Sequence, residues 1–168
     1  MRSASMNAAQ VAGRYTDLPD TEKALLWCIR AWVISLSGRP HLIERIDTTF
    51  ESLGASEGAA ELYGLMATVA RGARRFIEIN CVCYPHVGMD ERRLLDALAF
   101  QQHGRHEDAF DILTDLLSTE AALTACDYLI RLAVTLSAAG HASGLSGQAV
   151  HSFARSNGTA APGSYTLH

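Results

Sequence analysis

Two cysteines and three histidines form the group of residues in this sequence whose types best suit metal chemistry. Cys81, Cys83 and His86 make a Cys-x-Cys-x-x-His segment, and His103 and His106 follow later in the chain. In an extended chain residues i and i+2 point to the same side, so both thiols would face one ion. Zinc binds thiolate and imidazole in a tetrahedron. The sequence therefore gives a candidate zinc site.

The spacing of these residues leaves other interpretations open. Paired cysteines of structural zinc sites are typically separated by about two to four residues, whereas Cys81 and Cys83 are separated by one. His103 and His106 flank Gly104 at an expected helix turn. The alternatives are two small buried cysteines with polar loop histidines, or a thiol-based sensor. A disulfide between the two cysteines would be strained at this separation.

A second cluster is basic. Arg71, Arg74 and Arg75 stand at the end of an expected helix, with two more arginines beyond the next segment. Cations favour the negative end of a helix, so a solvated helix end explains them, and a patch for a small anion or an acidic protein partner is the functional alternative. The net charge of −4 and the lack of interleaved aromatic residues argue against nucleic acid.

Arg30 lies in the middle of the most apolar run, residues 24–36. A buried charge must be paired, so this arginine predicts a carboxylate partner, Glu61 or Asp127, or alternatively marks a polar pocket. The run is too short to cross a bilayer, and we expect no membrane partner.

The motifs of common enzymes are absent from the sequence. It has no glycine-rich phosphate loop, no Gly-x-Ser-x-Gly, no His-Glu-x-x-His and no Glu-x-x-His pair. The adjacent carboxylates Asp90 and Glu91 stand at an expected helix start, where they act as caps. This favours a protein that is not an enzyme, and we expect no cofactor, with zinc as the alternative.

Composition and periodicity predict an all-α protein. The 168 residues are 48% apolar, mainly alanine and leucine, which suit helices. Apolar residues at helical spacing predict an all-α single-domain bundle of about six helices over residues 19–140. Residues 1–18 are expected to be a flexible arm and residues 141–168 a flexible tail.

The third expected helix carries a stripe of small residues. Ala60, Gly64, Thr68 and Gly72 recur at every fourth position. A glycine inside a helix costs about 1 kcal/mol relative to alanine, so the stripe needs a reason. Close approach of another helix is one; a groove for a small-molecule ligand is the other.

Residues 77–84 alternate in the manner of a strand, with Ile77, Ile79, Cys81 and Cys83 on one side. A solitary strand cannot satisfy its own backbone. The segment is therefore an irregular extended crossing, or a strand that pairs with its own copy across a two-fold axis. We favour a homodimer.

These features predict a class of protein rather than a specific activity. The start of the chain lacks the apolar core of a secretory signal, and four sparse cysteines do not form a disulfide framework, so we expect a cytoplasmic protein. The favoured function is a non-enzymatic partner-binding or regulatory module acting as a homodimer. The alternative is a zinc-binding or thiol-based sensor that uses Cys81, Cys83 and His86.

Overall fold

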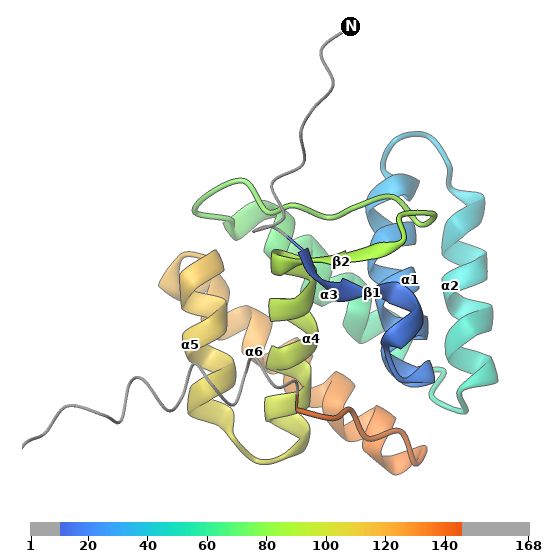
Figure 1. Ribbon diagram of the computed structural model, residues 1–168. Coiled ribbons are helices and arrows are strands. Elements are labelled where there is room, and N and C mark those ends of the chain that lie inside the picture. The colour runs from blue at the N-terminus through green and yellow to red at the C-terminus, as the bar shows by residue number, and fades with distance from the viewer. Residues whose placement is uncertain (1–10, 146–168) are drawn as a thin grey trace, which may run out of the picture.

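The computed structural model describes residues 11–145, which form a mostly α-helical single domain (Figure 1). Its two strands are β1 (Val11–Arg14) and β2 (His86–Gly88), and a short 3-10 turn follows β1 at Tyr15–Asp17. The six helices are α1 (Asp20–Ser35), α2 (His41–Ser52), α3 (Gly58–Gly72), α4 (Met89–Gln102), α5 (His106–Leu116) and α6 (Thr119–Ala138). The predicted six-helix bundle is confirmed.

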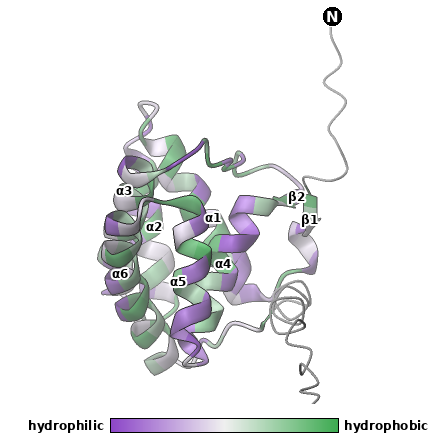
Figure 2. Cartoon of the chain, turned by 90° about the vertical axis from the view of Figure 1, so that its left-hand side faces the viewer, coloured by the Kyte–Doolittle hydropathy of each residue, from purple (hydrophilic) through white to green (hydrophobic). Residues whose placement is uncertain are grey.

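The helices pack in layers behind the small β-ribbon. β1 and β2 lie on one face, α1 and α4 lie beneath them, and α3 and α6 form the far side (Figures 1 and 2). Helix α2 packs against α1, and α5 packs against α4. The core between these layers is built from the leucines, isoleucines and alanines that the helical spacing had marked as inward-facing, such as Leu25, Ile46, Leu62, Leu95 and Leu129.

Gly64 and Gly72 of the small-residue stripe on α3 lie in close contact with α6, whereas Ala60 is exposed. A Cβ atom added to Gly64 would lie 2.1 Å from the ring of Tyr128, and one added to Gly72 would lie 2.1 Å from Cβ of Ala121. Real Cβ atoms do not approach other atoms so closely, so these positions require glycine. The space beside both glycines is filled by α6, which agrees with the helix-packing explanation and not with a ligand groove there.

The chain ends pack more than the sequence indicated. Residues 11–18, expected as part of the arm, form β1 and the turn, and β1 pairs antiparallel with β2 through Val11↔Gly88 and Arg14↔His86. At the other end, His141 Nε2 lies 2.9 Å from the carbonyl of Leu53. Ser143 is also buried, and its N–H donates to the side chain of Gln102 at 2.7 Å. Residues 1–10 and 146–168 of the expected arm and tail lie outside the described residues.

The segment predicted as strand-like, residues 77–84, is an irregular crossing, the first of the two alternatives. It runs across the top of the bundle from the end of α3 to β2 (Figure 1). Its alternation breaks at a turn in which Tyr84 N–H donates to Cys81 C=O at 3.0 Å. Ile77 and Ile79 are therefore half-buried, whereas Cys81 and Cys83 are exposed. The strand that does form, β2, pairs within the chain, so strand pairing no longer argues for a dimer.

Candidate functional site

The crossing segment, residues 75–85, is held in place by a buried ion pair between α1 and α4. Arg30 and Glu91 are both fully buried and make a bidentate pair, with Nε–Oε1 2.8 Å and Nη2–Oε2 2.7 Å. Arg30 also donates to the carbonyls of Tyr84 at 2.9 Å and His86 at 2.6 Å. The sequence predicted a buried, paired Arg30, but its proposed partners, Glu61 and Asp127, were wrong.

Glu91 completes this anchor from the other side. Its carboxylate accepts the backbone N–H of Asn80 at 2.8 Å and that of Gly88 at 2.7 Å. Burial raises the pKa of Glu91, but the hydrogen bonds from Arg30, Gly88 and Asn80 outweigh burial, and the net pKa lies below the ordinary range. The carboxylate thus stays ionised while it caps α4 and fixes the crossing segment.

Asp90, the neighbouring carboxylate, fixes the beginning of the same segment. Arg75 reaches it with two hydrogen bonds of 2.6 and 2.8 Å, and Glu78 N–H donates to it at 3.0 Å. The capping role predicted for Asp90 and Glu91 was therefore incomplete, because both also bind backbone groups ten or more residues earlier in the chain.

An apolar groove lies between this segment, α1 and α3. Its volume is about 370 Å³. The residues that line it are Trp32, Val33 and Leu36 of α1, Met66, Val69, Ala70 and Ala73 at the end of α3, and Arg75, Phe76, Ile77 and Ile79 of the crossing segment. Phe76 is 85% exposed and Leu36 is 66% exposed. Large apolar side chains at such exposure mark an interaction surface when they border a groove.

The predicted metal ligands are only partly brought together. Cys81 Sγ and Cys83 Sγ lie 3.1 Å apart on the exposed turn. The ring of His86 instead meets the ring of Tyr84, with centroids 5.7 Å apart. His103 and His106 lie beyond the opposite end of α4, about 20 Å away at 1.5 Å per helical residue. Within residues 11–145, no three His, Cys, Asp or Glu side chains are grouped to hold a metal ion.

The two histidines at the far end of α4 have local partners. His103 Nδ1 lies 2.7 Å from the carbonyl of Ala99, and His106 Nδ1 is hydrogen-bonded to the side chain of Gln101. These contacts place both residues at the α4–α5 turn, which agrees with polar loop histidines. The other half of that interpretation, two buried cysteines, is wrong, because Cys81 and Cys83 are exposed.

The basic cluster does not converge on one point. Arg75 is paired with Asp90, and Arg74 donates to the carbonyl of Thr114 at 3.3 Å. Arg71 is exposed on the last turn of α3. Arg92 points inward, where it binds Glu22 at 2.8 Å and Asp96 at 2.9 Å. The arginines therefore mostly hold the fold, and of this cluster Arg75 lines the groove.

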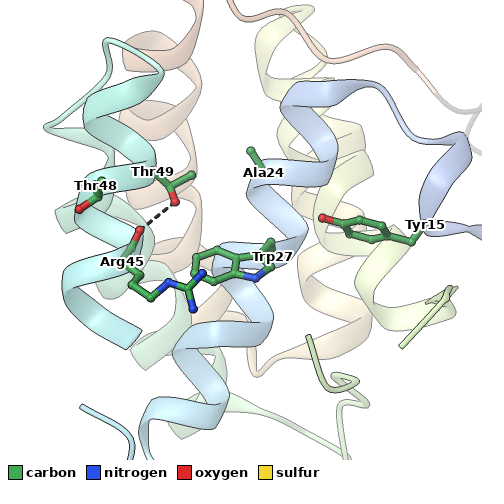
Figure 3. A pocket seen from close by; sticks show the side chains of 6 residues that line it. All are labelled: Tyr15, Ala24, Trp27, Arg45, Thr48 and Thr49. Carbon is green, nitrogen blue, oxygen red and sulfur yellow. Dashed lines mark hydrogen bonds between the residues drawn. The ribbon is translucent and has the colours of Figure 1, made fainter. Parts of the chain in front are cut away.

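A more polar pocket, which the sequence did not indicate, lies between α1 and α2 (Figure 3). Its volume is about 430 Å³, and the guanidinium of Arg45 lies over the ring of Trp27 at 5.1 Å from the centroid. The Thr49 hydroxyl donates to the carbonyl of Arg45 at 2.8 Å, and the Tyr15 hydroxyl donates to the carbonyl of Lys23 at 2.9 Å. Both hydroxyl protons are thus committed to the backbone, which leaves few donors for a ligand.

A second exposed apolar surface lies on α6. Leu123, Ile130 and Val134 are 40–64% exposed and fall on one stripe of the helix. By length and composition α6 could also cross a membrane, but core helices of soluble proteins pass the same test. It packs against α3, α4 and α5. We call this surface the α6 stripe.

A hollow of about 300 Å³ also borders the α6 stripe at Ile130 and Val134, but of the two surfaces only the groove has an exposed phenylalanine at its rim. The signal for it in the sequence was the run Phe76, Ile77 and Ile79, whose isoleucines were assigned to a strand. No family model, curated protein or solved structure matches this chain. The features of this protein that indicate a function are therefore the groove and the crossing segment.

Proposed function

We propose that this protein is a non-enzymatic partner-binding module that acts as a homodimer, in which each copy inserts Phe76 into the groove of the other. The observation that carries the proposal is an almost fully exposed phenyl ring at the rim of an apolar groove. A phenylalanine side chain can bury about 150–250 Å² when it is covered. Leaving it in water next to an apolar hollow is unfavourable unless a partner covers both.

Two copies of this chain can each fill the groove of the other, because the Phe76 side chain and the groove lie on the same face. In a two-fold symmetric interface each residue pair occurs twice, so a single surface must carry both complementary shapes. Arg75, which lines the groove, precedes Phe76, and the exposed Glu78 follows it, so a two-fold axis through this point can bring unlike charges together.

The anchors of the crossing segment support this role. Arg30, Asp90 and Glu91 fix the backbone after Phe76, at Glu78, Asn80 and Tyr84. Asp90 also holds the side chain of Arg75, directly before Phe76. A segment that is already ordered loses little conformational entropy when it binds. This explains why two buried carboxylates would be used to hold an irregular stretch of chain.

Light scattering of the full chain at micromolar concentration tests the proposal. We expect a mass of about twice 18.1 kDa. The Phe76→Ser variant should be a monomer with unchanged helix content, because its side chain makes little contact within one copy. Leu123→Ser on the α6 stripe is the matched control, since it removes a similarly exposed apolar side chain, and it should remain a dimer.

Other outcomes are equally informative. A dimer that dissociates with Leu123→Ser and not with Phe76→Ser would place the interface on the α6 stripe and overturn the proposal. A wild-type monomer at high concentration would remove the homodimer and leave the groove to an apolar segment of another protein, such as an amphipathic helix. Cytoplasmic location remains a prediction, and the alternative of a metal sensor receives no support from the ligand arrangement.

A further inference from the structure

The Cys81–Cys83 pair is a chemically distinctive feature that the groove does not use. Both thiols are exposed, and their sulfur atoms lie 3.1 Å apart. We propose that these cysteines form a dithiol site that reduces small-molecule disulfides by thiol–disulfide exchange and ends as a Cys81–Cys83 disulfide. This activity is independent of the proposed homodimer.

The turn makes a disulfide between Cys81 and Cys83 geometrically possible. In an extended chain Cα atoms of residues i and i+2 lie about 6.6–7.2 Å apart, at or beyond the upper limit of about 6.8 Å for a disulfide. The hydrogen bond from Tyr84 N–H to Cys81 C=O bends residues 81–84 into a tight turn instead. The sequence interpretation expected strain from the close separation of the two cysteines, and the turn brings their Cα atoms closer than an extended chain would. Any strain that remains makes the bond easier to reduce, so an excess of the small disulfide drives the exchange.

The two ends of the turn are fixed by the buried ion pair. Arg30 holds the carbonyl of Tyr84 just after the turn, and Glu91 holds the N–H of Asn80 just before it. The two thiols therefore stay close together without relying on contacts of their own. A second thiol held nearby acts at a high effective concentration once the first has reacted.

The surroundings give the two thiols different roles. The hydrogen bond between the two sulfur atoms lowers the pKa of the Cys81 thiol and raises that of the Cys83 thiol, whereas the positive charge of Arg30 lowers both pKa values. Since the thiolate is the nucleophile, Cys81 attacks first and Cys83 resolves the mixed disulfide.

The exchange balances in two steps. The Cys81 thiolate attacks one sulfur of the small disulfide, forming a mixed disulfide and releasing one small thiolate, which takes up the proton that Cys81 had lost. Cys83 then gives up its proton, and its sulfur attacks the Cys81 sulfur. The second small thiol leaves with that proton. One disulfide has been reduced to two thiols, and the dithiol has been oxidised by two electrons.

The experiment incubates the full chain with oxidised glutathione and follows intact mass and peptide maps. The intact mass of wild type should fall by two hydrogens as the Cys81–Cys83 disulfide forms, and dithiothreitol should restore the original mass. Cys83→Ser should stop as a single glutathione adduct on Cys81. In wild type, a brief pulse of substoichiometric iodoacetamide before the oxidant should alkylate Cys81 ahead of Cys83, because the pKa difference depends on the contact between the two thiols. Cys126→Ser, which removes the half-buried thiol of α6, is the matched control and should behave as wild type.

Several results would overturn this assignment. Stable glutathione adducts on wild type without an internal disulfide would show that the turn cannot close. Disulfides between copies, or equal alkylation of Cys81 and Cys83 in wild type, would remove the assigned roles. Circular dichroism of each variant checks the fold. The monomeric Phe76→Ser variant should retain the exchange, which separates failure of this proposal from failure of the dimer.

Discussion

The crossing segment and the α3–α6 contact hold the backbone in place by opposite means. Between residues 75 and 85 the chain has no regular structure, and backbone N–H and C=O groups are bound by the charged side chains of Arg30, Asp90 and Glu91. In α3 and α6 the helices satisfy their own backbones. What matters there is only that Gly64 and Gly72 leave room for Tyr128 and Ala121.

This difference has an energetic consequence. Burying two charges costs several kcal/mol for each ion, and a good ion pair roughly offsets that cost. The Arg30–Glu91 pair therefore positions the segment more than it stabilises the domain. The α3–α6 contact, in contrast, gains from close packing in proportion to the atoms that touch. Position and stability are thus supplied by different parts of the molecule.

The largest expected effect comes from breaking the ion pair on one side. Arg30→Met leaves the Glu91 carboxylate buried without its partner, and the free energy of unfolding should fall by about 3–5 kcal/mol. Urea unfolding followed by circular dichroism measures it. A loss below about 1 kcal/mol, the usual value of an exposed pair, would contradict the anchoring role.

A matched double variant separates charge from packing. Arg30→Met with Glu91→Leu removes both charges and should regain much of the lost stability. It should still leave the carbonyl of Tyr84 and the N–H of Asn80 without these partners. We therefore expect the double variant to fold while its Cys81–Cys83 exchange with oxidised glutathione slows, because the turn is no longer fixed.

A smaller effect is expected at the helix contact. Gly72→Ala places a methyl group on Cβ of Ala121, and overpacking of this kind costs about 1–3 kcal/mol. The exchanged pair, Gly72→Ala with Ala121→Gly, moves the methyl group across the contact and should restore most of the stability. If Gly72→Ala instead stabilised the protein, as helix propensity alone predicts, α3 and α6 would not be in close contact there.

These two regions also differ in how far the sequence predicted them. The stripe of Ala60, Gly64, Thr68 and Gly72 indicated close helix packing, because its spacing of four residues can be read within a single segment of the sequence. A buried, paired Arg30 was also predictable from its apolar neighbours. The partner of Arg30 was not predictable, because the sequence analysis had already assigned Glu91 to a helix cap. In the structure this one carboxylate both caps α4 and pairs with Arg30. Glu61, one proposed partner, pairs with Arg131 at 2.8 Å.

The sequence could not decide between the irregular crossing, which the structure shows, and the paired strand for a related reason. The alternation over residues 77–84 is real for Ile77 and Ile79, which pack inward, but the turn at Cys81 ends it. The true strand, β2, has three residues, too few to show a pattern. Its partner β1 lies over seventy residues earlier, in a stretch of mixed composition. Pairing between two such distant short segments cannot be predicted from the sequence of either one.

Acid should weaken the crossing segment selectively. Burial raises the pKa of Asp90, but the hydrogen bonds from Arg75 and from Glu78 N–H outweigh it, and the net pKa is lowered. A carboxyl whose pKa is lower in the folded state stabilises the protein above its unfolded pKa of about 3.9. That contribution is lost as the pH falls through the folded value.

The measurement is the melting temperature of wild type and Asp90→Asn between neutral and strongly acidic pH. The variant lacks the titrating group, so its melting temperature should be lower at neutral pH and the two curves should converge in acid. Parallel curves over the whole range would show that Asp90 does not contribute through its charge.

The smallest expected effect lies at the end of the α3–α6 contact, where Ser118 caps α6. Its hydroxyl oxygen accepts the N–H of Ala121 at 3.3 Å, a long bond on an exposed residue. Loss of a serine cap costs about 0.5–2 kcal/mol, and the length of this bond places Ser118→Ala near the lower end. The backbone bond from Ser118 N–H to Gly72 C=O, 2.9 Å, is unaffected by the substitution.

Thermal unfolding resolves this change, because about 1 kcal/mol shifts the melting temperature of a chain of this size by about 2–4 °C. Ser118→Asp is the control: it keeps an acceptor and adds a negative charge at the positive end of α6, so it should match or exceed wild type. A loss for Ser118→Ala as large as that for Gly72→Ala would mean that a polar cap, and not close packing, fixes this end of the contact. The two regions would then be held by the same means after all.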